Sequence, residues 1–83
     1  MTKQDFIKAG FQEWHNGGGN MVMAKVAETK YVLISDQDDC HLSYTQDMVS
    51  IGMYDSETDE CVQDLVDVNI DEATSTADGM LSA

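Results

Sequence analysis

Basic residues are scarce in this chain, which has no arginine and only four lysines against sixteen acidic residues. The formal net charge is −12, and a field of this sign repels nucleic acid and anionic membrane surfaces while it attracts basic partners. It excludes a nucleic-acid-binding surface made of basic and aromatic side chains. The lack of arginine also argues against recognition of phosphorylated substrates, because the planar guanidinium is the side chain suited to bidentate phosphate contacts.

Long apolar runs are also missing. No stretch approaches the roughly 20 apolar residues that cross a bilayer, and the start MTKQDFIKAG lacks the apolar part of a secretion signal. We therefore expect a cytoplasmic protein. The two cysteines, Cys40 and Cys61, are then expected to be reduced thiols, with a disulfide as the alternative in an oxidising compartment.

The charge is distributed unevenly along the chain. All four lysines precede Tyr31, and three acids accompany them there. The other thirteen acids lie in residues 31–83, which contain no lysine or arginine. The sequence thus has a near-neutral first part and a strongly acidic second part.

Apolar residues make up 42% of the 83 residues, which is enough for one small core. We expect a single domain over residues 1–71. Residues 72–83 are small and polar, and we expect them to form a frayed tail.

A first helix is expected over residues 3–15. Thr2 and Asp5 have the spacing of a capping box, and the glycines at 17–19 end the helical pattern. One apolar stripe runs along this helix at Phe6, Ile7, Gly10, Phe11 and Trp14. We expect Phe6, Ile7, Phe11 and Trp14 to pack against strands that contain Val22, Val26, Leu33 and Ile51.

Strands are predicted where the apolar pattern changes to a period of two. This pattern covers residues 21–26 and 49–54, and the apolar run 31–35 indicates a central strand paired with its predecessor. A polar loop at 36–39 and a short strand over 41–45 complete the middle of the chain. The expected fold class is α+β: a small antiparallel sheet of three or four strands with an N-terminal helix and a C-terminal acidic helix.

The acidic helix is expected over residues 57–69. Ser56 precedes acids in the first turn, where the helix dipole favours them. A strand is the alternative, because Val66, Val68 and Ile70 alternate with polar residues and β-branched side chains favour strands.

In a helix, the acids of this segment would form one ridge, with a carboxylate about every 5 Å along the axis. The ridge residues are Glu57, Glu60, Asp64, Asp67 and Asp71. Phosphates on one DNA strand have a similar, slightly wider spacing. Such a face lacks the lysines that would form i,i+4 salt bridges. The loop acids Asp36, Asp38 and Asp39 extend the expected partner-binding surface. The alternative is a solvated face that serves solubility.

No metal, cofactor or catalytic site is expected. The acids of 55–59 alternate like early EF-hand ligands, but Glu60 and Val66 stand where that loop needs glycine and a bidentate glutamate. Only loose binding of divalent cations remains plausible there. Cys40 and His41 are adjacent, which is not the spacing of zinc ligands. No glycine-rich phosphate loop follows a strand, so we expect a binding protein and not an enzyme.

Taken together, the acidic ridge, the loop acids and the base-free stretch from Tyr31 onward resemble the small acidic inhibitors of phages and mobile elements. These include anti-CRISPR proteins, uracil-DNA glycosylase inhibitors and other DNA mimics. The resemblance lies in size, charge and layout. It implies that the protein inhibits a basic nucleic-acid-binding partner, such as a CRISPR effector or a DNA-processing protein, by occupying its groove.

A second class of function stays open. The chain would then be a small accessory or structural interaction protein, or a homodimer, whose charge serves only solubility. An apolar patch around Trp14 would provide the contact, although Trp14 and the six methionines are expected mainly in the core.

Overall fold

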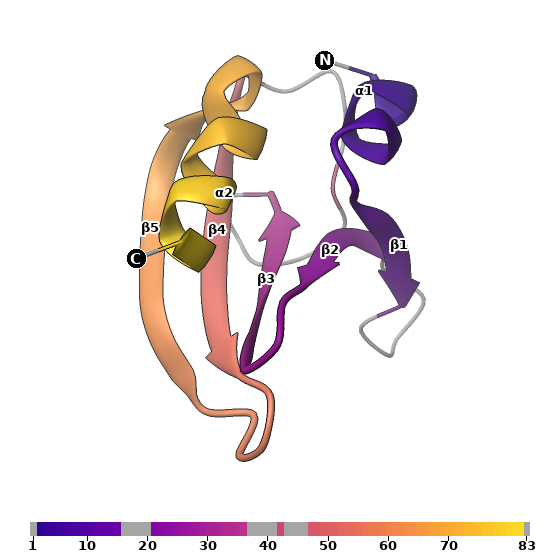
Figure 1. Ribbon diagram of the computed structural model, residues 1–83. Helices are drawn as coiled ribbons and strands as arrows, with labels where there is room; N and C mark the ends of the chain where they lie inside the picture. The colour runs from indigo at the N-terminus through magenta and orange to yellow at the C-terminus, as the bar shows by residue number, and fades with distance from the viewer. Residues whose placement is uncertain (1, 16–20, 37–41, 43–46, 83) are drawn as a thin grey trace.

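The computed structural model describes residues 2–15, 21–36, 42 and 47–82 (Figure 1). Its elements are α1 (Lys3–Lys8), β1 (Gln12–His15), β2 (Met21–Val26), β3 (Lys30–Ser35), β4 (Met48–Asp55), β5 (Cys61–Asn69), the 3-10 helix η1 (Ile70–Glu72) and α2 (Ala73–Ser82).

The strands form one antiparallel sheet in the order β1-β2-β3-β4-β5. The expected α+β class, with a helix before the sheet and a helix after it, is confirmed. The sheet has five strands, so it is larger than expected. Because every strand pairs with its neighbours in sequence, β1 and β5 are the two edges.

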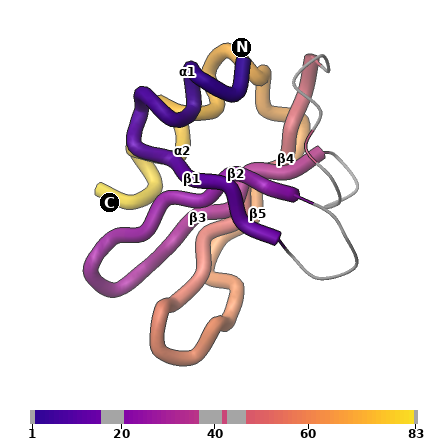
Figure 2. The backbone as a smooth tube through the Cα atoms, turned by 90° about the vertical axis from the view of Figure 1, so that its right-hand side faces the viewer, coloured from indigo at the N-terminus to yellow at the C-terminus, as the bar shows by residue number. Residues whose placement is uncertain are grey.

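Both helices lie on the same side of the sheet (Figure 2). Since side chains alternate between the two faces of a strand, β3 directs Val32 and Ile34 toward the helices and Tyr31 and Leu33 away from them. The core forms between helices and sheet. Its buried members are Phe6, Phe11, Met23, Val32, Ile34, Leu42, Val49, Ile51, Met53, Ile70, Ala73, Ala77 and Met80.

The helix predicted over residues 3–15 is wrong beyond Lys8. Its start is as expected, because Thr2 and Asp5 form the capping box. Its end is a Schellman motif at Gly10, whose φ is 97°. The Phe11 N–H donates to the Phe6 carbonyl at 3.0 Å, and their rings meet edge to face at 5.9 Å. Gly10 therefore ends the helix, although the predicted apolar stripe included this residue.

After this stop the chain enters β1, where Trp14 is opposite Val22 of β2. Phe6 and Phe11 are buried in the core with Ile51, as expected, but Val22, Val26 and Leu33 do not belong to this core. Ile7 is 41% exposed, and Trp14 is not part of the core cluster. The expected packing of Trp14 and Ile7 in the core is wrong.

Three strand predictions are confirmed, since residues 21–26, 31–35 and 49–54 lie in β2, β3 and β4. For the strand expected over 41–45, only Leu42 is among the described residues, and it is not in a strand. The loop expected at 36–39 lies outside the described residues except for Asp36.

The acidic helix predicted over 57–69 is wrong, and β5 replaces it. Hydrogen bonding to β4 decides the outcome, together with the β-branched residues Val62, Val66 and Val68. A strand also separates acids that would repel one another at i,i+3 and i,i+4 on a helix. The alternative interpretation, a strand indicated by β-branched residues that alternate with polar ones, is the correct one.

The expected frayed tail over 72–83 is instead the helix α2, in which Ala73, Ala77 and Met80 are buried. The first turn begins at η1, where the Asn69 side chain accepts the Asp71 N–H at 2.9 Å. The buried residues recur at helical spacing, and all three belong to the core cluster between helix and sheet. The domain therefore includes residues 73–82.

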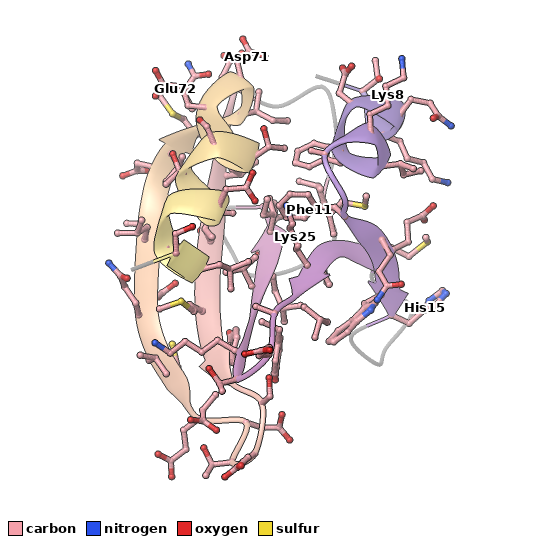
Figure 3. All side chains as sticks on the ribbon, viewed as in Figure 1. Lys8, Phe11, His15, Lys25, Asp71 and Glu72 are labelled. Atoms are coloured by element: carbon pink, nitrogen blue, oxygen red, sulfur yellow. The ribbon has the colours of Figure 1, made fainter. Side chains whose placement is uncertain are left out.

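Lys25 of β2 joins the two helices to the sheet (Figure 3). Its Nζ donates to the Ala9 carbonyl at 2.9 Å and to Asp78 Oδ1 of α2 at 2.6 Å. The same ammonium lies 5.4 Å from the centre of the Phe11 ring. One cation thus satisfies the end of α1 and a carboxylate of α2.

Gly79→Ala tests whether α2 is a formed helix. Gly79 is exposed, and a Cβ built there meets no atom within 4 Å. Alanine should therefore raise the free energy of unfolding by about 0.8–1 kcal/mol, the difference in helix propensity. Chemical denaturation measures it. The buried Ala77→Asp should be strongly destabilising, and two neutral substitutions would contradict the helix.

Phe6→Ala tests the core under α1. The side chain is fully buried, so its loss should lower the free energy of unfolding by about 3–5 kcal/mol. Ile7→Ala in the same helix turn is the control and should cost less than about 1 kcal/mol, because Ile7 is exposed. Equal losses in thermal unfolding would refute the described orientation of α1.

Candidate functional site

Exposed acids follow one edge of the sheet, from the β4–β5 hairpin along β5 to η1. This acidic edge consists of Glu57, Asp59, Glu60, Asp64, Asp67, Asp71 and Glu72. Nine residues of strand span about 30 Å at the usual rise. Asp71 and Glu72 lie at the end away from the hairpin, and Lys8 and His15 lie on the opposite side of the molecule (Figure 3).

The hairpin that carries three of these acids is held by its own hydrogen bonds. The Asp55 carboxylate accepts the N–H groups of Glu57 at 2.8 Å and Thr58 at 3.2 Å. The Asp59 N–H donates to the Asp55 carbonyl at 2.8 Å, and Asp59 has a φ of 59°, which aspartate tolerates better than most residues. This turn replaces the helix cap expected at Ser56.

Two register shifts interrupt the pairing of β5 with β4. At one of them Asp67 has a φ of 57°. Bulges and charged side chains on an edge strand both hinder pairing with another strand. The acidic edge is therefore better suited to side-chain contacts than to extension of the sheet.

The five acids of the predicted ridge do not share one helical face. Glu57 and Glu60 lie in the hairpin, Asp64 and Asp67 in β5, and Asp71 in η1. The fold brings them to one edge, but not to one regular row. Asp36 follows β3, two strands away from β5 in the sheet, and Asp38 and Asp39 lie outside the described residues.

Three aromatic rings form a second feature, on the face of the sheet that the helices leave open. Trp14 and Tyr31 have ring centres 5.4 Å apart, and Tyr31 stacks on Tyr54 at 5.3 Å with an angle of 16° between the planes. We call these three residues the aromatic ladder. Each ring is half-buried. The sequence offered one signal, since Tyr31 and Tyr54 alternate with the core residues of β3 and β4.

Gly52 gives the ladder its shape. It lies two residues before Tyr54 on the same face, and a Cβ at Gly52 would be 2.9 Å from the Tyr54 ring and its hydroxyl. The missing side chain therefore lets the ring of Tyr54 lie down over β4. Across the sheet, Gly52 is opposite Asp64 of β5, so this carboxylate flanks the Tyr54 ring on the same face.

A hydrogen bond joins the ladder to the acidic edge. The Tyr31 hydroxyl donates to Asp59 Oδ1 at 2.9 Å, and the Ser56 N–H donates to the Thr29 carbonyl at 2.9 Å, which ties the two hairpins together. Desolvation by burial raises the pKa of Tyr31 above its ordinary value of 10.0, and the bond to Asp59 raises it further.

Within the described ranges, no three His, Cys, Asp or Glu side chains converge where they could hold a metal ion. Cys61 is an exposed free thiol, and Cys40 is not among the residues described. No helix in the described part of the chain has the length and hydropathy to span a membrane.

The Tyr31–Asp59 bond predicts a shift in ionisation. In Asp59→Asn, the pKa of Tyr31 should fall toward its ordinary value, because the nearby negative charge is lost. Tyrosinate absorbance during alkaline titration measures it, with Tyr31→Phe identifying the Tyr31 transition. Because the pKa of Tyr31 is raised in the folded protein, its protonated hydroxyl contributes to the free energy of unfolding. This contribution is fully present below pH 10.0 and is lost as pH rises through the raised pKa. Unchanged titration in Asp59→Asn would contradict the bond.

Comparison with known proteins gave no similarity on which to draw: no family model, no curated protein and no solved structure matches the chain.

Proposed function

We propose that the protein binds a basic, nucleic-acid-binding partner through its acidic edge and inhibits that partner by competing with its DNA or RNA. The observation that carries this proposal is the placement of charge. Residues 31–83 contain thirteen acids and no lysine or arginine, and the seven acids of the acidic edge are exposed along one side of the sheet.

The one-sided arrangement is costly for stability, because like charges repel across the same surface. Two ion pairs of the described residues involve acids, Lys3 with Glu13 and Lys25 with Asp78. Neither includes a residue of the acidic edge. Exposed carboxylates of the edge, such as those of Glu57, Glu60 and Asp64, can therefore contact basic side chains of another protein.

Strand geometry changes how such competition would work. Glu60, Asp64 and Asp67 are separated by four and three residues, which corresponds to about 13 and 10 Å in an extended chain. A helix would have placed them about 5 Å apart. The proposal therefore rests on the total charge of the edge, which attracts the lysines and arginines that otherwise contact phosphates, and not on a match of spacing.

Electrostatic attraction of this kind has two consequences. It accelerates encounter with a positively charged groove, which helps a small inhibitor compete with nucleic acid. It is also screened by salt, since the Debye length falls from about 10 Å at 0.1 M to about 3 Å at 1 M. These features fit an inhibitor of the class that the sequence resembles.

The test begins with capture of a partner from a host lysate on immobilised protein. The purified partner is then bound to a fluorescent oligonucleotide, and displacement by the protein is measured. Asp64→Lys should weaken displacement about fivefold, or about 1 kcal/mol, and higher salt should weaken it for the unchanged protein as well.

The matched control is Gln4→Lys combined with Gln12→Lys. Both glutamines are exposed, and the pair changes the net charge by the same two units on the β1 side of the molecule. It should have a smaller effect than Asp64→Lys. Displacement that is indifferent to salt and to Asp64→Lys would overturn the proposal and leave charge with a role in solubility alone.

A further inference from the structure

The open face of the sheet carries an apolar row that neither α1 nor α2 covers. Val26 is opposite Tyr31, Tyr31 is opposite Tyr54, and Tyr54 is opposite Cys61, so the row crosses four strands. Val26 is 54% exposed, and the two tyrosines are half-buried. At about 4.8 Å between strands, the row extends roughly 15 Å.

Carboxylates flank this row at two points. Asp59 contacts the Tyr31 hydroxyl, and Asp64 lies across from Gly52, over which the Tyr54 ring is folded. Asp59 uses Oδ1 for the Tyr31 bond, while Oδ2 has no protein partner within the described ranges. Stacked rings with carboxylates beside them favour a ligand that is both planar and positively charged.

We propose that the aromatic ladder binds an arginine side chain of the partner, with the guanidinium against one of the half-buried rings and a flanking carboxylate accepting its N–H groups. This inference rests on the proposed function, because it specifies which residue of the basic partner is recognised. Charge complementarity favours arginine, because the surface combines π faces with carboxylates and the whole chain has a net charge of −12.

Arginine fits this surface better than the other candidates. Its guanidinium is planar and weakly hydrated, so it stacks on aromatic rings while it donates to a carboxylate. The lysine ammonium is compact and strongly hydrated, so its desolvation costs more free energy. A nucleic-acid base would also stack, but its phosphates would meet the repulsion of the acidic edge.

The probes are a short oligoarginine peptide and an oligolysine peptide of equal length and charge. Trp14 is the only tryptophan in the chain, so its fluorescence reports on the ladder directly. The oligoarginine peptide should bind about threefold more tightly, the size of an exposed cation–π contact. It should also change the Trp14 emission and shift the ring-proton resonances of Tyr31 and Tyr54.

Two variants separate the ring from its hydroxyl. Tyr54→Phe keeps the stacked ring and should retain the preference for arginine, whereas Tyr54→Leu should abolish it and leave the charge-driven binding that both peptides share. The resonance shifts of the unchanged protein provide a second measurement that does not depend on whether Tyr54→Leu folds.

Equal affinity for the two peptides, without any change at Trp14 or the tyrosine rings, would overturn this inference. The proposed function would survive that result if oligonucleotide displacement still responded to salt and to Asp64→Lys. Failure of displacement, with the preference for arginine intact, would instead reject the proposed function and leave the arginine site.

Discussion

The alternation of side chains along the central strands is the constraint on which the rest of this structure depends. β3 and β4 place Val32, Ile34 and Ile51 on one face, where α1 and α2 cover them. The residues that alternate with these core residues along each strand must then face the other way. Tyr31 and Tyr54 are such residues, and with Trp14 they form the aromatic ladder. One pleat therefore produces both the core and the exposed aromatic face.

The meander topology turns the order of charges in the sequence into an arrangement in space. Each strand lies beside its predecessor, so the near-neutral start of the chain becomes the β1 side and the acidic second part becomes the β5 side. Within the described sheet no strand crosses over between the two parts. The Tyr31–Asp59 bond then connects the acidic hairpin to the ladder, so the two surfaces that we propose for partner binding are contiguous.

Local patterns predicted the elements well where only one reading was possible, and poorly where two competed. Gly10 continued the apolar stripe of a helix, but it also fits a left-handed helix end, and the Phe6–Phe11 contact decides for the second reading. Residues 61–69 carry both acidic helical spacing and β-branched alternation, and the open edge of β4 decides for a strand. In α2, Ala73 and Ala77 offered too little apolar surface to be recognised without the sheet against which they pack.

The sequence by itself determined the α+β class, the central strands, the capped start of α1 and the strongly acidic second part, because these depend on composition and short-range periodicity. The tertiary structure alone decided that the acids line a strand edge, that residues 73–82 form a helix, and that three aromatic residues from β1, β3 and β4 meet. These features depend on which strands pair and in which register. Register brings together residues far apart in the sequence, and no local pattern encodes such contacts.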